Sequence, residues 1–173
     1  LIKVFFGDGK KLNVEIKYSK EEKPLGTVGP LKLLDSQING TFIAVNGDTL
    51  TDMDFADMVR YHNKNKNIAT IALTQRKVNI DFGVVEKDKN NNITSWSEKP
   101  DITYWVSMGI YVFEKSVLNY IPNEKKFDLP DLVDLLLEDG KKVGGYIHSG
   151  YWLDIGRPED YKVACDDFGK IIK

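Results

Sequence analysis

Residues 41–48 read Thr-Phe-Ile-Ala-Val-Asn-Gly-Asp, an apolar run that closes on a polar turn. The run is rich in β-branched side chains and does not alternate with polar ones, which is typical of a central strand covered on both faces. Ligands of open α/β sheets bind outside the carboxyl ends of such strands. Asp48 stands at that end and is a candidate site residue, although it could also do no more than cap the turn.

Strand-like and helix-like segments alternate on both sides of this run. The further predicted strands are 13–18, 68–73, 82–86, 93–96, 108–113 and 143–147, and the predicted helices are 31–36, 54–63, 114–120, 129–137 and 158–168. The alternation predicts an α/β fold, with a layered, Rossmann-like, mixed and mostly parallel sheet and helices on both faces. Because no repeat or linker interrupts the pattern, we expect one domain over 1–173.

The composition is that of an ordinary globular domain. The chain has 173 residues, of which 42% are hydrophobic and 29% charged, enough for a real core. A net charge of -2 gives no electrostatic reason to expect nucleic acid or an anionic membrane as a partner. No apolar run approaches the length of a membrane span, and no signal peptide is evident. The single cysteine, Cys165, cannot form an internal disulfide, and a reducing, cytoplasmic location is expected.

A second carboxylate lies in the stretch 151–161, which reads Tyr-Trp-Leu-Asp-Ile-Gly-Arg-Pro-Glu-Asp-Tyr. This pattern places Asp154 between bulky apolar neighbours at a strand end, and Arg157 and Pro158 then begin a helix. A carboxylate in such surroundings is costly to desolvate unless it meets a cation, a metal or several donors. Asp48 is the partner that the rest of the sequence offers for a shared metal ion.

Residues 98–100 read Glu-Lys-Pro. Pro100 disfavours a helical conformation of the residue before it, so we expect Lys99 to be extended. Glu98 suits the hydroxyl groups of a hydroxyl-rich, phosphorylated ligand, and Lys99 suits its phosphate as a point charge. The competing interpretation is a solvated charged loop.

Glycines mark three further positions of interest. The loop 25–30 reads Leu-Gly-Thr-Val-Gly-Pro and leads into a helix start, where free backbone N–H groups could bind a base edge or an anion. A plain turn is the alternative. Gly83 and Gly109 fall inside predicted strands, which indicates a bulge or the close approach of another group.

Six short motifs, taken in order, resemble those of the sugar-nucleotide pyrophosphorylases, and they extend over nearly the whole chain. This family of NDP-sugar nucleotidyltransferases includes mannose-1-phosphate guanylyltransferase and glucose-1-phosphate thymidylyltransferase. The motifs are Leu25-Gly26-Thr27-x-Gly29, Asn46-Gly47-Asp48, Phe82-Gly83-Val84-Val85, Glu98-Lys99-Pro100, Gly109-Ile110-Tyr111-Val112-Phe113 and Trp152-Leu153-Asp154-Ile155-Gly156.

The resemblance implies an enzyme that transfers a nucleoside monophosphate from an NTP to a sugar 1-phosphate and releases pyrophosphate. It implies that Asp48 and Asp154 hold a catalytic Mg²⁺ and that Lys99 binds the sugar phosphate. Two carboxylates suit Mg²⁺, and such transfers depend on positioning and charge neutralisation. A homo-oligomer is also compatible, because members of the family often form dimers or tetramers.

The resemblance also implies the positions that contact the substrates. Gly26 and Thr27 would lie in the loop that contacts the nucleotide, whereas Gly83, Glu98 and Ser107 would bind the sugar. Many members of the family carry Asn at the position of Ser107. The motifs do not choose a base or a sugar.

The chain departs from the family pattern at its start. The family opens with a strand and a Gly-rich loop of the form Gly-x-Gly-Thr-Arg-Leu, followed later by Lys-Pro. That segment is absent before Leu1, so we expect a nucleotidyltransferase domain without its N-terminal strand and Gly-rich loop.

Two other functions stay open at this point. One is a metal-dependent glycosyltransferase that uses an NDP-sugar, since residues 52–54 have the Asp-x-Asp spelling of its metal motif. A helix cap is the competing interpretation of Asp54. The other is a non-catalytic fragment that binds a sugar phosphate.

Overall fold

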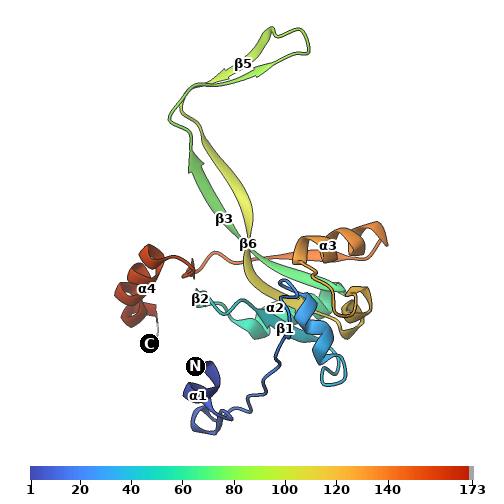
Figure 1. The fold of residues 1–173 in the computed structure, drawn as a ribbon. Coiled ribbons are helices and arrows are strands. Elements are labelled where there is room, and N and C mark those ends of the chain that lie inside the picture. The colour runs from blue at the N-terminus through green and yellow to red at the C-terminus, as the bar shows by residue number, and fades with distance from the viewer. Residues whose placement is uncertain (172–173) are drawn as a thin grey trace. The chain divides into compact units, whose positions relative to one another are not determined.

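The computed structural model describes residues 1–171, and residues 172 and 173, the last two of the expected domain, lie outside the described residues. The chain forms two compact units. The first unit comprises Leu1–Phe42 and Phe113–Val143, and the second comprises Ile43–Val112 and Gly144–Lys173 (Figure 1). The expectation of a single domain stays a prediction.

The first unit contains short helices around a small apolar core. Its helical elements are α1 (Ile2–Phe6), η1 (Lys10–Leu12), η2 (Gly29–Leu34), η3 (Lys115–Tyr120) and α3 (Leu129–Glu138). The predicted helices 31–36, 114–120 and 129–137 are thus confirmed. Pro30 lies in the first turn of η2, where its missing N–H costs nothing, and Asp128 and Asp131 form a capping box at the start of α3. The buried core residues here include Val117, Leu118, Ile121, Leu132 and Leu136.

The predicted strand at 13–18 is wrong, because this segment is irregular and mostly exposed. Its backbone donors turn back on the preceding loop: Val14 N–H donates to the Gly9 carbonyl (3.3 Å), and Ile16 N–H donates to the Asp8 carbonyl (2.9 Å). Alternation of apolar and polar residues favours a strand only where a neighbouring strand accepts its hydrogen bonds. Local turn bonds take that role here.

Most residues of a four-stranded sheet, and all residues of two two-stranded ribbons, belong to the second unit. The sheet has the order β1-β6-β3-β7, and the ribbons are β2–β8 and β4–β5, both antiparallel. The strands are β1 (Phe42–Val45), β2 (Thr49–Thr51), β3 (Ala69–Asn79), β4 (Val84–Lys87), β5 (Ile93–Ser97), β6 (Asp101–Phe113), β7 (Val143–Ile147) and β8 (Trp152–Asp154). The helices of this unit are α2 (Phe55–Asn65) and α4 (Pro158–Ile171).

The expectation that 41–45 forms a central strand is wrong. In the described part of the chain β1 lies at the edge of the sheet, with β6 as its neighbour. Ile43 is 39% exposed and Val45 is 47% exposed, so one face of the strand is open. A continuous apolar run indicates burial but cannot distinguish a central strand from an edge strand, because that depends on the neighbours. The most deeply buried strand segment is instead 108–113 of β6.

The core of the second unit forms where β6 and β3 meet α2. Its buried members are Met53, Met58, Ala72, Met108, Ile110 and Val112. Helix α2 begins where its spacing predicts, because Asp54 caps it by accepting hydrogen bonds from Ala56 N–H (2.8 Å) and Asp57 N–H (3.3 Å).

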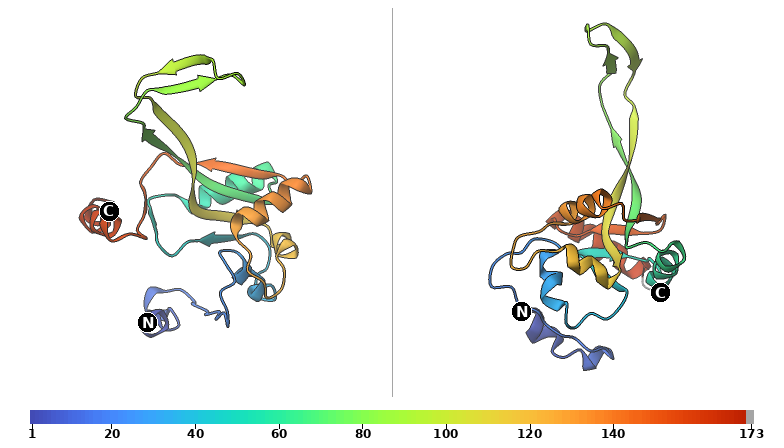
Figure 2. Two further views of the ribbon diagram at one scale, coloured as in Figure 1. Left: turned by 45° about the horizontal axis from the view of Figure 1, so that its top comes forward. Right: turned by 90° about the vertical axis from the view of Figure 1, so that its right-hand side faces the viewer.

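Strands β3 and β6 are much longer than the predicted segments 68–73 and 108–113. Figures 1 and 2 show β3 leading into the β4–β5 hairpin and β6 returning from it, so these two strands run antiparallel. Ile80 N–H donates to the Pro100 carbonyl (3.2 Å) where the two strands meet the hairpin. The predicted hairpin around the polar tip 87–92 is confirmed. None of the helices in residues 1–171 has the length and apolar character needed to span a membrane.

Candidate functional site

The β2–β8 ribbon brings Asp48 and Asp154 together. Asp48 directly precedes β2, and Asp154 ends β8 opposite Thr49. Ile155 N–H donates to the Asp48 carbonyl (2.8 Å), and Gly156 N–H donates to Asp154 Oδ1 (2.9 Å). Asp154 Oδ1 and Asp48 Oδ2 lie 3.0 and 3.5 Å from the point where a Cβ on Gly156 would stand. Two carboxylates from distant parts of the sequence thus face one small volume.

Trp152 anchors this ribbon to the sheet. Its indole Nε1–H donates to the Met108 carbonyl (2.9 Å), which Thr49 Oγ1 also contacts (3.4 Å). Trp152 also packs against the methionine-rich core of the second unit. The carboxylate pair is therefore tied to β6, the most buried strand.

Gly109 brings the turn after β1 against β6. Asn46 N–H donates to the Gly109 carbonyl (2.8 Å), and Gly109 has φ +75°. A Cβ at Gly109 would lie 2.8 Å from Asn46 Nδ2, which is too close for an ordinary contact. Only glycine meets both conditions. The close approach expected at Gly109 is confirmed, and it holds Asn46 beside the segment that carries Asp48.

The donor set fits Mg²⁺. Asp48 and Asp154 would be its two carboxylate ligands, and among the described residues no group of three or more acidic, histidine or cysteine side chains gathers where it could hold a metal ion. Mg²⁺ commonly uses one or two carboxylates and completes its shell with waters and phosphate oxygens. The pair thus suits a metal that arrives with a phosphorylated substrate. The role of both residues as ligands stays a prediction.

A second cluster forms on the β4–β5 hairpin around Gly83, Trp96 and Glu98. The Trp96 indole N–H donates to Glu98 Oε2 (3.2 Å), and a Cβ on Gly83 would lie 2.5 Å from Trp96 Cζ2. The close approach expected at Gly83 is confirmed, although Gly83 precedes β4 instead of lying within it. The sequence interpretation did not single out Trp96, which lies on β5 two residues before Glu98 and is 64% exposed.

The extended conformation expected for Lys99 is wrong. Lys99 has φ +44° because residues 98–100 turn the chain from β5 into β6. The turn, and not an extended backbone, therefore sets the relative directions of Glu98 and Lys99.

Gly26 and Thr27 belong to the first unit, and the N–H groups of residues 27–29 are not free, which agrees with the alternative of a plain turn. Thr27 N–H donates to Asp128 Oδ1 (2.9 Å), and the N–H groups of Val28 and Gly29 donate to the Phe127 carbonyl (3.2 and 3.0 Å). Thr27 Oγ1 in turn accepts from Leu129 N–H (2.9 Å). The loop is held against the start of α3, so these donors are already in use. A nucleotide contact by Gly26 and Thr27 stays a prediction.

Ser107 lies on β6 close to Gly109. Its hydroxyl donates to the Tyr111 hydroxyl (3.3 Å) and accepts from Gly109 N–H (3.4 Å). Both distances are long for hydrogen bonds, so the Ser107 hydroxyl is held only weakly by these two partners. Within the second unit, the described contacts connect Ser107 with the Asn46–Gly109 turn, and Gly83 and Glu98 form the separate hairpin cluster.

The Asp-x-Asp spelling at 52–54 is explained by structure. Asp54 caps α2, Met53 is 6% exposed in the core, and Asp52 Oδ1 contacts His148 Nε2 (2.9 Å). The helix cap that the sequence favours for Asp54 is confirmed. Both carboxylates thus have structural partners, Asp52 in His148 and Asp54 in the first turn of α2.

Replacing Asp54 with Ala is expected to lower the free energy of unfolding by about 1 kcal/mol, because the first turn of α2 loses its cap. The rate of pyrophosphate release, the reaction that the family resemblance implies, should stay at saturating Mg²⁺ within about twofold of the rate of the unsubstituted protein. Chemical denaturation measures the free energy of unfolding, and an assay of pyrophosphate release measures the rate. A loss of Mg²⁺ dependence in this variant would instead support the Asp-x-Asp interpretation.

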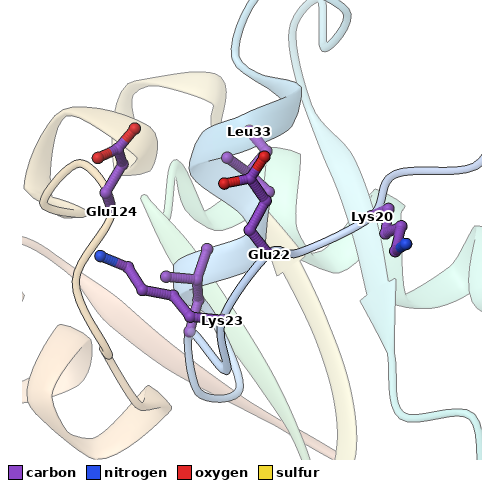
Figure 3. Close-up of a pocket in the computed structure, with 6 residues that line it drawn as sticks. Lys20, Glu22, Lys23, Leu33 and Glu124 are labelled. Atoms are coloured by element: carbon purple, nitrogen blue, oxygen red, sulfur yellow. The ribbon is translucent and has the colours of Figure 1, made fainter.

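One hollow of about 370 Å³ lies in the first unit (Figure 3). Its lining residues are Lys20, Glu22, Lys23, Leu25, Leu33 and Glu124. In Figure 3 the Lys23 side chain extends toward Glu124, so opposite charges share the opening. None of the candidate site residues lines it, and we assign it no ligand.

The sequence of the chain matches a known protein family. The model of the family described as "Nucleotidyl transferase" matches residues 2–170. The chain belongs to this family. The match extends over almost all of the chain, so the resemblance inferred from the six motifs is confirmed.

Curated relatives of this nucleotidyl transferase chain act on sugar phosphates, by their names. A mannose-1-phosphate guanylyltransferase of Mycobacterium tuberculosis is 34% identical over 161 residues, which is 90% of this chain and 45% of the relative. A UTP–glucose-1-phosphate uridylyltransferase of Synechocystis is 33% identical over 180 residues, which is 92% of this chain and 46% of the relative. The chain therefore spans about half the length of the curated relatives that it matches.

Solved structures show the same fold. HddC of Yersinia pseudotuberculosis superposes with a TM-score of 0.71 at 25% identity, over 96% of this chain and 73% of that one. A putative glucose-1-phosphate thymidylyltransferase of Bacillus anthracis gives a TM-score of 0.71 at 24% identity, over 94% and 69%. The predicted α/β class with a mixed sheet is confirmed.

Proposed function

We propose that the protein containing this chain transfers a nucleoside monophosphate from an NTP to a sugar 1-phosphate and that Asp48 and Asp154 hold the Mg²⁺ required. The observation that carries the proposal is the convergence of these two carboxylates beside Gly156. The names of the curated relatives support the same reaction class, since they are guanylyl- and uridylyltransferases of sugar 1-phosphates.

In this reaction a phosphate oxygen of the sugar 1-phosphate attacks the α-phosphorus of the NTP. The new P–O bond forms as the bond from the α-phosphorus to the oxygen bridging the β-phosphorus breaks. Pyrophosphate leaves with that electron pair, and an NDP-sugar remains. Protein side chains form no covalent bond with the substrates in this reaction, so the protein contributes the alignment of the substrates and the neutralisation of their charge.

Each candidate residue has a separate task in this proposal. When bound, Mg²⁺ would neutralise phosphate charge, and Asp48 and Asp154 would fix its place. Lys99 would hold the attacking phosphate as a point charge. Glu98 would accept hydrogen bonds from sugar hydroxyls, with Gly83 and Ser107 beside the sugar. Gly26 and Thr27 would contact the nucleotide.

The remaining partners are also proposed. The substrates are one NTP and one sugar 1-phosphate, with neither nucleic acid nor a membrane as partner. A cytoplasmic location would suit the proposal, because nucleotides are available there and the one cysteine of these 173 residues, Cys165, has no partner for a disulfide within them. A homo-oligomer fits the proposal, and light scattering would test it.

Assaying pyrophosphate release from the four NTPs against several hexose 1-phosphates would test the reaction. We expect release with one preferred NTP–sugar pair, and only when Mg²⁺ and both substrates are present. Release of NDP from an NDP-sugar, with glycosyl transfer to an acceptor, would identify the glycosyltransferase alternative. Binding of sugar 1-phosphate without turnover in every combination would identify a non-catalytic protein.

Replacing Lys99 with Ala is expected to raise KM for the sugar 1-phosphate about tenfold or more, because a charge-assisted bond to phosphate contributes about 1.5–3 kcal/mol. KM for the NTP should change little. Steady-state kinetics with each substrate varied in turn gives both values. As a control, Lys89→Ala removes an exposed lysine from the hairpin tip and should leave both values unchanged. A parallel rise of both KM values in Lys99→Ala would contradict the assignment to the sugar phosphate.

A further inference from the structure

His148 and Asp52 meet at the end of the β2–β8 ribbon opposite the carboxylate pair. His148 Nε2 lies 2.9 Å from Asp52 Oδ1, although the two residues are 96 positions apart in the sequence. Asp52 directly follows β2, and His148 lies in the loop between β7 and β8. The His148 side chain is 13% exposed, whereas that of Asp52 is 45% exposed. The imidazole is thus held in a confined place while its partner reaches water.

The same end of the ribbon is closed by backbone contacts. Asp52 N–H donates to the Tyr151 carbonyl (3.3 Å), which also accepts from Thr51 Oγ1 (2.8 Å). The pKa of the Asp52 carboxyl is lowered, chiefly by a hydrogen bond from the Tyr151 backbone and further by His148, although burial opposes this. An ionised Asp52 is a stronger hydrogen-bond acceptor than a neutral one. A Cβ on Gly150 would collide with both Asp52 and His148, so the loop packs tightly around the pair.

The ribbon needs such support because it is very short. It consists of three residue pairs, Thr49 with Asp154, Leu50 with Leu153 and Thr51 with Trp152. Two-stranded ribbons are marginal on their own. Because side chains alternate between faces, a slip of one residue would turn the Asp154 side chain to the other face, away from Asp48.

We propose that His148 and Asp52 are positioning residues, which fix the register of β2 against β8 and thereby keep Asp154 beside Asp48. The consequence for catalysis rests on the proposed function, whereas the register itself does not. The pair closes one end of the ribbon, Trp152 anchors its middle through the Met108 carbonyl, and Ile155 N–H closes the other end on Asp48. Removing the pair leaves a ribbon of three residue pairs held only through Trp152 and Ile155, so the whole ribbon, including its Ile155 end, opens more often.

The test compares His148→Ala with His148→Gln. The Gln amide N–H can donate to Asp52 in place of Nε2, whereas Ala removes the contact. In His148→Ala we expect the Ile155 and Gly156 amides to exchange hydrogen faster. We also expect kcat to fall about tenfold or more and the Mg²⁺ concentration for half-maximal rate to rise, as for other residues that orient metal ligands. KM for the sugar 1-phosphate should stay unchanged, and Gln should restore most of each effect.

Arg60→Ala is the matched control, because it removes exposed ion pairs with Asp57 and Asp54 at the start of α2 in the same unit. It should change neither amide exchange at Ile155 nor the Mg²⁺ requirement. Unchanged exchange in His148→Ala, or equal losses in the Ala and Gln variants, would overturn the positioning role. Faster exchange in His148→Ala, with no nucleotidyl transfer by the unsubstituted protein, would uphold the register and overturn the proposed function instead.

Discussion

Replacing Asp154 with Asn is expected to lower the rate of nucleotidyl transfer by about two orders of magnitude or more while the fold stays intact. Asn keeps the shape of Asp and offers one oxygen, so it can still accept the bond from Gly156 N–H that Asp154 Oδ1 accepts at 2.9 Å. It lacks the negative charge that a divalent cation needs from a ligand. The measurement is the initial rate of pyrophosphate release as a function of Mg²⁺ concentration.

The control for this variant is Asp134→Asn, which removes one exposed carboxylate from α3. It should leave the rate and the Mg²⁺ requirement unchanged. Thermal unfolding of both variants would show whether stability is preserved. A near-normal rate in Asp154→Asn would remove this residue from the metal site and with it the main support for the proposed chemistry.

Replacing Gly109 with Val is expected to destabilise the protein by about 2–3 kcal/mol and to abolish most activity. A β-branched residue at φ +75° carries a backbone penalty on the order of 1–3 kcal/mol, and its Cβ would press on the Asn46 side chain from 2.8 Å. Relief of that contact would move the turn that carries Asp48. Denaturant unfolding gives the change in stability, and the assay above gives the activity.

Gly47→Val provides the matched control for stability. A Cβ on Gly47 would meet nothing within 4 Å, and its φ lies outside the left-handed region. This variant should lose less than about 1 kcal/mol. Equal destabilisation of both variants would show that the close approach of Gly109 to Asn46 contributes little to the fold.

Sequence patterns predicted an element correctly where the interactions that stabilise it join residues close in the sequence. Helix α2 follows from the spacing of its apolar residues and from the Asp54 side chain that caps its first turn. The hairpin β4–β5 follows from two β-rich segments around a polar tip. In both cases the residues that decide the element lie within one or two turns of it, so neighbours in sequence carry the needed information.

Patterns failed where the outcome depends on a distant partner. The apolar run of β1 indicates burial, yet its place at the edge follows from which strands pair with it. Residues 13–18 alternate like a strand, but the N–H groups of Val14 and Ile16 donate to the preceding turn. The N–H groups of Thr27 and Val28 looked available in sequence, whereas Asp128 and Phe127 accept them from about a hundred positions away.

The candidate site shows the same division. The sequence by itself determined the family, the α/β class and the identity of the two candidate carboxylates, because motifs and apolar runs are patterns of residues that are close in the sequence. Only the tertiary structure decided that β2 pairs with β8 in the register that places Asp154 opposite Thr49 and beside Asp48. The same pairing brought His148 to Asp52. Register is a property of two strands and their anchors, so neither strand alone contains it.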